Sequence, residues 1–404
     1  MNKLIVILFA SFCILGCSCK QQPEVTPDPV VEPVAVQKTN DTRVFMHYMP
    51  WFHSKDYSGY WGSHWRMDNA NPEYTLGNGN LHIASHYYPL IGPYDSSDPD
   101  VIDYHLLLMK YTGIDGVLID WYGSHDVLDY GTNLGNSNAL ISGIKRVGLE
   151  YAVVYEEFTA EEVARRRSFS ALEAAQRDMA YLESNYFSDE EYIQIAGSPL
   201  MLTFGPRYFR SSSQWSQILM ELGQSPTFLP LWDHRSLVGT SNSSGEFSWV
   251  DFNSNQSHLS SFYQGAGSSM IIGSAYPGFH DFYEEGGWGD SYGYLDHANG
   301  ATLQKTLDLA TQYDLPYLQL VTWNDFGEGT MFEPTQEFEY QYLEMVQDFA
   351  GVTYDREDLE LIHTYYLKRK ELDGNSSAQN TLDEAFDALI QLDVDKARNL
   401  LNRL

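Results

Sequence analysis

Cysteine is nearly absent from this chain, and its few examples lie at one end. The 404 residues contain three cysteines, Cys13, Cys17 and Cys19, and none follows them. A disulfide or a cysteine-ligated metal is therefore excluded from everything after residue 19. Positive charge is also scarce, because 24 Lys and Arg stand against 55 Asp and Glu, giving a net charge of −31. This acidity serves solubility and argues against nucleic acid or an anionic membrane surface as an electrostatic partner, whereas a neutral polysaccharide stays open.

The apolar run near the start, residues 4–15, is too short to span a membrane as a mature helix. It follows a short charged head and leads into Ile-Leu-Gly-Cys, which matches the bacterial lipobox and ends at Cys17. We expect 1–16 to be a lipoprotein signal peptide, Cys17 to be lipidated, and 17–42 to be a Pro-rich, lipid-anchored tether. A plain signal peptide is the alternative. The expected location is the periplasmic face or the cell surface of a bacterial outer membrane.

Nucleotide-binding signatures are missing too. Neither GxGxxG nor GxxxxGK[ST] follows the first predicted strand, which argues against a doubly wound nucleotide-binding sheet. The chain shows instead a regular alternation of apolar strands and amphipathic helices. We predict strands at 43–49, 116–123, 151–155, 199–204, 226–232, 247–252, 270–276 and 317–321, with helices at 98–113, 136–147, 160–184, 212–222, 256–264 and 300–312.

Eight strands separated by helices predict an α/β protein with a (β/α)8 TIM barrel over residues 43–354. The long segment 54–98 interrupts the alternation early, and loops of this length are usually functional. After the barrel, apolar residues at helical spacings predict a small C-terminal helical appendage over residues 355–404.

Polar and aromatic residues end nearly every predicted strand, and in a barrel these ends meet at one mouth. Aromatic faces pack on sugar rings, although the same residues could also form core. No HxH or HxxxH pair stands out among the candidate ligands His47, His53, His86, His234 and His280, so we expect hydrogen bonding, with no metal and no cofactor. The predicted substrate-binding residues are His47, Tyr48, Trp51, His86, Asp120, Trp121, Tyr122, Tyr155, Tyr276, Asp281, Trp323 and Asn324.

Carboxylates give this mouth its chemistry. In the segment 316–334 a buried strand changes abruptly into a polar turn with Asp325 and Glu328 three residues apart. Glu156 ends another predicted strand across the mouth. Burial and mutual repulsion can separate the pKa values of such groups into an acid and a base, as glycoside cleavage requires. Similar clusters also occur as solvated turns or calcium sites, so the spacing alone leaves these readings open.

Five collinear segments resemble glycoside hydrolase family 99. They are HYYPLIGPYDSSDP (86–99) followed by GVLIDWYG (116–123), then VYEEF (154–158), YPGFHD (276–281) and NDFGEGTMFE (324–333). The family pattern has YYP-x-x-GPYSS-x-DP, SWYPP, HIEPY, GPGYID and NEWHEGTQIE at the corresponding places. The resemblance covers roughly residues 43–340.

The resemblance implies a (β/α)8 endo-α-mannosidase or α-mannanase that retains configuration. Glu328 would be the general acid/base, and Glu156 or Asp325 would assist the substrate's 2-hydroxyl, with Glu156 favoured. This chain departs from the pattern at Asp325, Gly327 and Phe279. Its WNDxGE form resembles glycoside hydrolase family 71, which cuts α-1,3-glucan. We therefore expect a monomeric enzyme acting on a polysaccharide or oligosaccharide, with an α-1,3-glucanase or a non-catalytic carbohydrate-binding lipoprotein as the alternatives.

Overall fold

The computed structural model describes residues 31–253 and 255–404. The chain divides into two units, Met1–Val31 and Glu32–Leu404, and all helices and strands below belong to the second. The predicted signal peptide, Cys17 and the first part of the tether lie outside the described residues. Within the two ranges, every helix is too short or too polar to cross a membrane.

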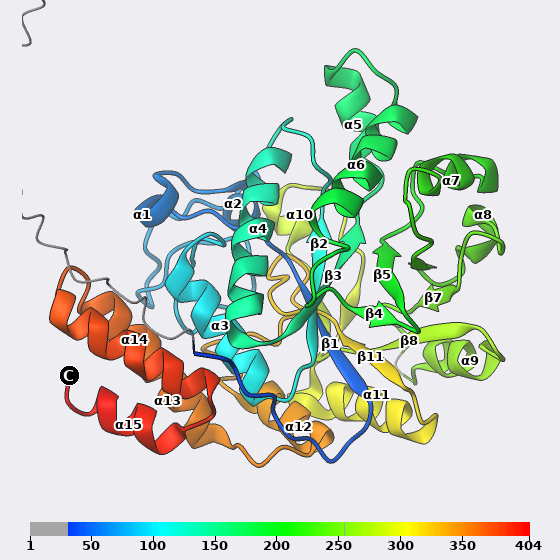
Figure 1. Ribbon diagram of the computed structural model, residues 1–404. Coiled ribbons are helices and arrows are strands. Elements are labelled where there is room, and N and C mark those ends of the chain that lie inside the picture. Colours follow the sequence, from blue (N-terminus) through cyan, green and yellow to red (C-terminus); the bar gives the residue numbers. More distant parts are fainter. Residues whose placement is uncertain (1–30, 254) are drawn as a thin grey trace, which may run out of the picture. The chain divides into compact units, whose positions relative to one another are not determined.

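Eight parallel strands close into a barrel, as the alternation predicts (Figure 1). They are β1 (Arg43–Tyr48), β2 (Gly116–Trp121), β3 (Glu150–Tyr155), β5 (Ser198–Thr203), β6 (Thr227–Pro230), β7 (Gly245–Phe247), β8 (Met270–Ala275) and β11 (Tyr317–Leu320). The seam between β6 and β7 is the weakest. There the strands meet through one parallel bridge, Leu231 to Phe247, and two 2.9 Å backbone hydrogen bonds, from the Trp232 N–H to the Phe247 carbonyl and from the Ser244 N–H to the Phe228 carbonyl.

Helices follow the barrel strands and cover their outer faces. The main helices are α3 (Pro99–Tyr111), α4 (Tyr130–Val147), α6 (Ala171–Asn185), α7 (Ser212–Leu219), α8 (Arg235–Val238), α9 (Ser257–Gly265), α11 (Ala301–Gln312) and α12 (Gln341–Ala350). The start of α3 is the predicted one, because Asp98 accepts a 3.0 Å hydrogen bond from the Asp100 N–H and Pro99 is the first helical residue.

Short helices and strand pairs lie in the connections around the barrel. They are α1 (Lys55–Ser58), α2 (Ser63–Arg66), α5 (Thr159–Arg166), α10 (Tyr283–Gly286), η1 (Ala298–Gly300) and the strand pairs β4 (Gln194–Ile195) on β5 and β9 (Phe279–His280) with β10 (Tyr294–Leu295). The long segment between β1 and α3 contains the short helices α1 and α2, so part of it has regular secondary structure.

Two predicted elements differ from the structure. The single helix expected over 160–184 is two helices, α5 and α6, because Ser170 caps α6 by accepting a 3.1 Å hydrogen bond from the Glu173 N–H. The strand expected at 247–252 lies at Gly245–Phe247 instead. Residues beyond it turn toward the mouth, where Trp249 lines the pocket described below.

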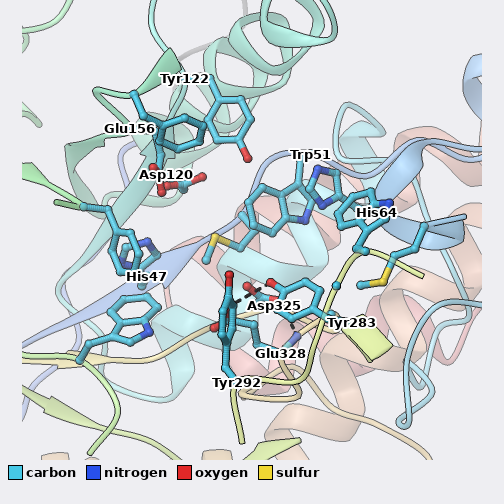
Figure 2. Close-up of a pocket in the computed structure, with 18 of the residues that line it drawn as sticks. His47, Trp51, His64, Asp120, Tyr122, Glu156, Tyr283, Tyr292, Asp325 and Glu328 are labelled. Carbon is cyan, nitrogen blue, oxygen red and sulfur yellow. Dashed lines mark hydrogen bonds between the residues drawn. The ribbon is translucent and has the colours of Figure 1, made fainter. Parts of the chain in front are cut away.

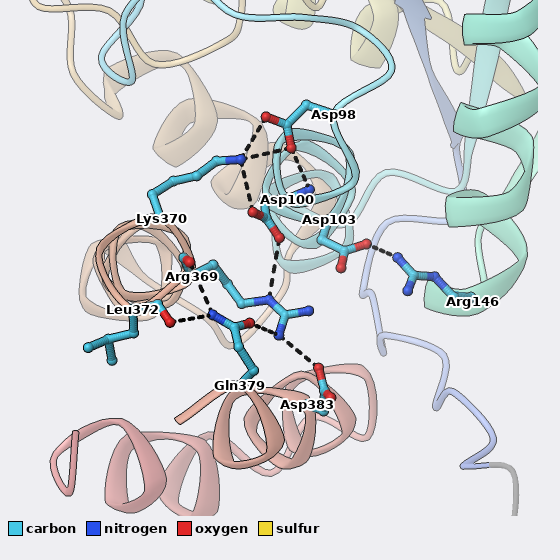
Figure 3. A network of polar contacts seen from close by, with 9 residues as sticks. All are labelled: Asp98, Asp100, Asp103, Arg146, Arg369, Lys370, Leu372, Gln379 and Asp383. Carbon is cyan, nitrogen blue, oxygen red and sulfur yellow. Dashed lines mark hydrogen bonds and ion pairs between the residues drawn. The ribbon is translucent and has the colours of Figure 1, made fainter. Parts of the chain in front are cut away.

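The C-terminal helices are α13 (Arg356–Glu371), α14 (Ser376–Ile390) and α15 (Val394–Leu401); α13 packs against α3, and α14 and α15 pack on α13 and on each other. Figure 3 shows the polar network between them. Lys370 Nζ lies 2.6 Å from Asp98 and 2.9 Å from Asp100, and Arg369 lies 2.8 Å from Asp383 on α14. Because Asp98 also caps α3, the appendage is attached at the start of a barrel helix.

The described part of the predicted tether packs on the fold. The Val34 N–H donates to the Ile390 carbonyl at 3.0 Å, and Lys110 Nζ donates to the Val34 carbonyl at 2.6 Å. Lys38 pairs with Asp115, just before β2, at 2.5 Å. Residues 32–42 therefore lie along the amino-terminal ends of the barrel strands, at the end away from the strands' carboxyl termini.

Candidate active site

A cavity of about 560 Å³ opens at the carboxyl ends of the barrel strands. Its walls come from the ends of β1, β2, β3 and β5 and from the segments after β7, β8 and β11. The lining residues are His47, Met49, Trp51, Phe52, His64, Met67, Asp120, Tyr122, Glu156, Phe158, Phe204, Arg207, Trp249, Tyr283, Trp288, Gly289, Asp290, Ser291, Tyr292, Asp325, Gly327 and Glu328. The size is that of a small-ligand site.

Asp120 and Glu156 form one wall of the cavity (Figure 2). Asp120 lies in β2 and Glu156 directly follows β3, and these two strands pair with each other. The two residues are 3% and 8% exposed. Burial raises the pKa of Glu156 to about 7, against the opposing effect of the Arg207 guanidinium. Burial and the neighbouring charge of Glu156 raise the pKa of Asp120 well above its usual range. One of these two carboxyls therefore keeps its proton when the other ionises.

Asp325 and Glu328 form the facing wall, on the turn after β11 (Figure 2). The Glu328 N–H donates to Asp325 Oδ1 at 2.8 Å, and the Tyr283 hydroxyl donates to Glu328 Oε1 at 3.2 Å. Burial raises the pKa of Asp325 to about 7, although the N–H groups of Glu328 and Gly327 lower it. Burial and the charge of Asp325 hold the pKa of Glu328 well above its usual range. Glu328 is therefore the carboxyl suited to stay protonated as an acid near neutral pH.

Backbone contacts hold this turn in place. The Asp325 N–H donates to Thr322 Oγ1 at 2.8 Å, which anchors the start of the turn. The His280 N–H donates to the Glu328 carbonyl at 2.8 Å, and the Phe282 N–H does the same to Gly327. These hydrogen bonds attach the turn to the segment that also carries Tyr283. Glu328 and the Tyr283 hydroxyl that donates to it are therefore positioned together.

Aromatic rings complete the cavity. Trp51 stacks on His64 with centroids 4.1 Å apart and planes 7° apart, and Tyr122 lies beside Trp51. Trp288 and Tyr292 come from the segment between α10 and β10 and remain 42% and 70% exposed. These faces at the cavity rim offer apolar surface next to carboxyls, the combination that a sugar ring requires.

Seven of the residues predicted for catalysis or substrate binding line the cavity: His47, Trp51, Asp120, Tyr122, Glu156, Asp325 and Glu328. The other predicted binding residues do not line it: Tyr48, His86, Trp121, Tyr155, Tyr276, Asp281, Trp323 and Asn324. The expectation that every polar or aromatic strand end faces the mouth is therefore wrong, because side chains alternate along a strand. Asp120 and Tyr122 face the mouth, whereas Trp121 between them packs outward.

The outward-facing residues hold the strands to the helices and connections around the barrel. Tyr48 bonds His105 at 3.0 Å, Tyr155 donates to Asp178 at 2.8 Å, and the Tyr276 hydroxyl accepts from the Asp251 N–H at 3.1 Å. Trp121 and Trp323 are fully buried among other rings. Their roles in the structure are packing and support of the barrel wall.

Three other predicted residues support the cavity from behind. Asn324 bonds both the N–H and the carbonyl of Met49, a lining residue, at 2.8 and 3.0 Å. Asp281 accepts from Ser291 Oγ at 3.0 Å and from the Tyr292 N–H at 2.8 Å. His86 stacks on His280 at 3.6 Å.

Several lining residues were missed by the sequence interpretation, chiefly Arg207, Trp249, Tyr283, Trp288 and Tyr292. They lie on connections after strands, where no periodic pattern marks direction. The one available signal was position, since Arg207 closely follows β5 and Trp249 closely follows β7. Across the described ranges, no group of three or more His, Cys, Asp or Glu side chains is arranged to hold a metal ion.

A closed (β/α)8 barrel with buried carboxyl groups at its mouth is an architecture that glycoside hydrolases use. More particularly, residues 39–234 match the model of Glycosyl hydrolase family 99. This match confirms the resemblance to family 99. It includes Asp120 and Glu156 and ends before the turn that carries Asp325 and Glu328, so the WNDxGE variant of that turn stays a sequence observation.

Two kinds of relative agree with the family match. A glycoprotein endo-alpha-1,2-mannosidase of Xenopus laevis is 30% identical over 91 residues, which are 20% of this chain and 20% of that protein. The chain thus matches about a fifth of that relative's length. The structure of the GH99 endo-alpha-mannosidase from Bacteroides thetaiotaomicron is 19% identical, with 77% of this chain and 97% of that chain covered and a TM-score of 0.61.

A further solved structure, described as a glycoside hydrolase-like protein, is 12% identical, with 80% of this chain and 98% of that chain covered and a TM-score of 0.56. At such identities the likeness concerns the fold. Together with the closed ring of strands, it confirms the predicted (β/α)8 barrel.

Proposed function

We propose that the protein is a glycoside hydrolase of the endo-α-mannosidase type, which cleaves internal α-linkages in a polysaccharide or glycan. The observation that carries the proposal is the pair of facing walls, Asp120 with Glu156 and Asp325 with Glu328, across one cavity. The family match and the two named endo-α-mannosidases support the same class of reaction.

In the proposed first step, Glu328 donates its proton to the glycosidic oxygen as the bond from that oxygen to C1 breaks. Glu156 accepts the proton of the substrate's 2-hydroxyl, whose oxygen forms a bond to C1 from the opposite face. The result is a 1,2-anhydro sugar, as the family resemblance implies. Glu156 suits this role because Arg207 opposes the effect of burial on its pKa and keeps the carboxylate accessible near pH 7.

In the proposed second step, water attacks C1 and opens the anhydro ring. The Glu328 carboxylate takes the water's proton, and Glu156 returns a proton to the 2-oxygen, so both carboxyls regain their starting states. Two displacements at C1 retain the anomeric configuration. Asp325, one hydrogen bond from Glu328, is the alternative partner for the 2-hydroxyl.

Hydrolysis of a small panel tests the proposal: yeast mannan, α-1,3-glucan and α-glucosylated mannosides, with NMR of the first-formed anomer. The Glu328→Gln variant should lose about a hundredfold to ten-thousandfold in rate while the fold is kept, because the amide cannot donate a titratable proton. Glu360→Gln, on the exposed face of α13, is the matched control. Unchanged turnover by Glu328→Gln would refute the assignment.

The departures from the family motif favour a second candidate. Asp325 and Gly327 give the turn a form that resembles family 71, and cleavage of α-1,3-glucan with no action on mannan would support a glucanase. Binding across the panel without turnover would instead support a carbohydrate-binding lipoprotein built on the same barrel.

We also propose that Cys17 is lipidated and holds the protein at a bacterial outer membrane, on its periplasmic face or at the cell surface. The lipobox supports this, and so does the path of residues 32–42, which join the barrel at the end opposite the cavity. Mass spectrometry of the N-terminal peptide should find a lipid on Cys17, and Cys17→Ala should move the protein to the soluble fraction. An unmodified, uncleaved N-terminus would contradict the proposal.

A further inference from the structure

His47 has one ring nitrogen with a partner and one without. It lies near the end of β1, is 1% exposed, and lines the cavity. Nδ1 lies 3.4 Å from Gln319 Oε1, whereas Nε2 has no hydrogen-bond partner among the described residues. A buried polar atom without a partner is costly, so its position at a ligand cavity calls for an explanation.

Gln319 determines which nitrogen of His47 carries the proton. It lies on β11, adjacent to β1, and its side chain is fully buried in the barrel. Gln319 Nε2 lies 2.5 Å from the Ser248 carbonyl, which can only accept a hydrogen bond. The amide nitrogen is thereby assigned to that side, and Oε1 faces His47. Since Oε1 can only accept, Nδ1 must be the protonated nitrogen.

The ring is also neutral at ordinary pH. Burial lowers the pKa of His47 to about 4, although the hydrogen bond with Gln319 opposes this effect. A neutral ring with its proton on Nδ1 has a lone pair on Nε2 and no hydrogen there. Trp249 packs edge-on against the ring with centroids 4.9 Å apart, which restricts its rotation.

We propose that His47 Nε2 accepts a hydrogen bond from one hydroxyl group of the sugar bound in the cavity, and that His47 is thereby a specificity-determining residue. This inference rests on the proposed function, because it takes the ligand to be a glycan. Asp120 Oδ2 and Glu156 Oε2 on the adjoining strands also lack partners in the described part of the chain. The side of the cavity formed by β1, β2 and β3 thus offers polar atoms to the hydroxyl groups of a sugar. His47 requires that the hydroxyl facing Nε2 be present to donate a hydrogen bond.

The first test needs no ligand. In protein with ¹⁵N-labelled histidine, NMR of the His47 ring, assigned with a His47→Phe variant, should show hydrogen on Nδ1 and none on Nε2 at pH 7. A hydrogen on Nε2 would overturn the proposal whatever the enzyme's activity. Absence of turnover by the wild type on the whole glycan panel would instead count against the proposed function, so the two failures are distinguishable.

The second test joins a protein variant to a ligand variant. Calorimetry would measure the binding of an α-glucosylated methyl mannoside and its monodeoxy and deoxyfluoro analogues to Glu328→Gln. One position should lose about tenfold in affinity when its hydroxyl is removed, because one hydrogen bond of about 1.4 kcal/mol is lost. Fluorine at that position should not restore affinity, since it cannot donate. With His47→Phe added, the same replacement should have no effect.

His258→Phe is the matched control, because His258 pairs with Asp233 at 3.0 Å outside the cavity. It should leave the tenfold discrimination intact. If every analogue loses the same affinity with and without His47, or if no probe binds while the tautomer is as expected, recognition through Nε2 is refuted.

A third variant reverses the polarity of His47. Gln319→Glu places a carboxylate against Nδ1, which favours the imidazolium and converts Nε2 into a donor. We expect the hydroxyl-to-fluorine replacement to be tolerated in this variant, because an Nε2–H can donate to fluorine as well as to a hydroxyl oxygen. Wild-type discrimination in a folded Gln319→Glu protein would contradict the role assigned to Gln319.

Discussion

The Tyr283 hydroxyl lies 3.2 Å from Glu328 Oε1 and donates to it. This bond stabilises the ionised form of Glu328, which opposes the burial and the Asp325 charge that keep the group protonated. Tyr283 therefore tunes the carboxyl that we assign as the acid, and it comes from α10, an element with no counterpart in the predicted barrel pattern.

Tyr283→Phe should raise the pKa of Glu328 further, because the variant lacks the donor that favours the carboxylate. The alkaline limb of the kcat/KM profile should move to higher pH, and kcat should fall by about tenfold through lost positioning. A profile measured on the best panel substrate checks this. Tyr57→Phe, on exposed α1, is the control, and an unshifted alkaline limb in Tyr283→Phe would contradict the assignment.

The wild-type kcat/KM profile should be bell-shaped. Glu156 must be ionised to accept a proton, so activity should fall as the pH drops below about 7. Glu328 must be protonated, so activity should fall again at alkaline pH. Arg207→Gln removes the guanidinium that lowers the pKa of Glu156, and the acid limb should then move to higher pH. If the acid limb did not move in Arg207→Gln, Arg207 would not be the group that lowers the pKa of Glu156, and the prediction would be contradicted.

The buried Glu156 should also lower the free energy of unfolding at high pH. Its pKa is about 7 in the folded protein and near 4.5 when unfolded, so the folded state binds the proton more tightly. Stability from this group is full below pH 4.5 and is lost as the pH rises through 7. Glu156→Gln should therefore raise the free energy of unfolding by up to about 3 kcal/mol at pH 8 and change it little at pH 4. Urea titrations at both pH values measure this, and equal effects at the two would contradict it.

The C-terminal helices should unfold together with the barrel. Lys370 bonds Asp98, which caps α3, and Asp100 in the first turn of α3, and its side chain is 37% exposed (Figure 3). Lys370→Gln should destabilise the protein by about 1 kcal/mol or less, because solvent screens a half-exposed pair, and salt should reduce the difference. Arg165→Gln, in an exposed ion pair on α5, is the control. Two separate transitions in the wild type would show an independent appendage.

Much of the barrel could be predicted because its information is local. The helix start at Asp98-Pro99 depends on a cap and a proline that are neighbours in the chain. The strands were marked by buried apolar runs, although β7 was placed too late, since Trp249, Val250 and Phe252 continue an apolar pattern after the strand has ended and Trp249 turns into the cavity wall. The split between α5 and α6 was missed because a single serine cap interrupts an otherwise helical pattern.

The site was only half predictable. Glu156, Asp325 and Glu328 could be identified because carboxyl groups are unusual directly after apolar strands; the first two are buried and Glu328 is half-buried. Whether a neighbour such as Trp121 faces the cavity or a helix depends on strand register, which a run of consecutive aromatic residues does not reveal. Arg207 and Tyr283 come from connections whose direction depends on contacts with distant segments.

The amino-acid sequence by itself determined that this protein is an acidic (β/α)8 barrel with carboxyls gathered at the ends of its strands, because those features follow from periodicity and composition. Only the tertiary structure decided which carboxyls face one another, which cation opposes them, and which nitrogen of His47 is left without a partner. The physical reason is that pKa values and tautomers depend on burial and on the atoms within a few ångströms. Those atoms come from strands such as β1 and β11, which are far apart in the chain and adjacent in the barrel.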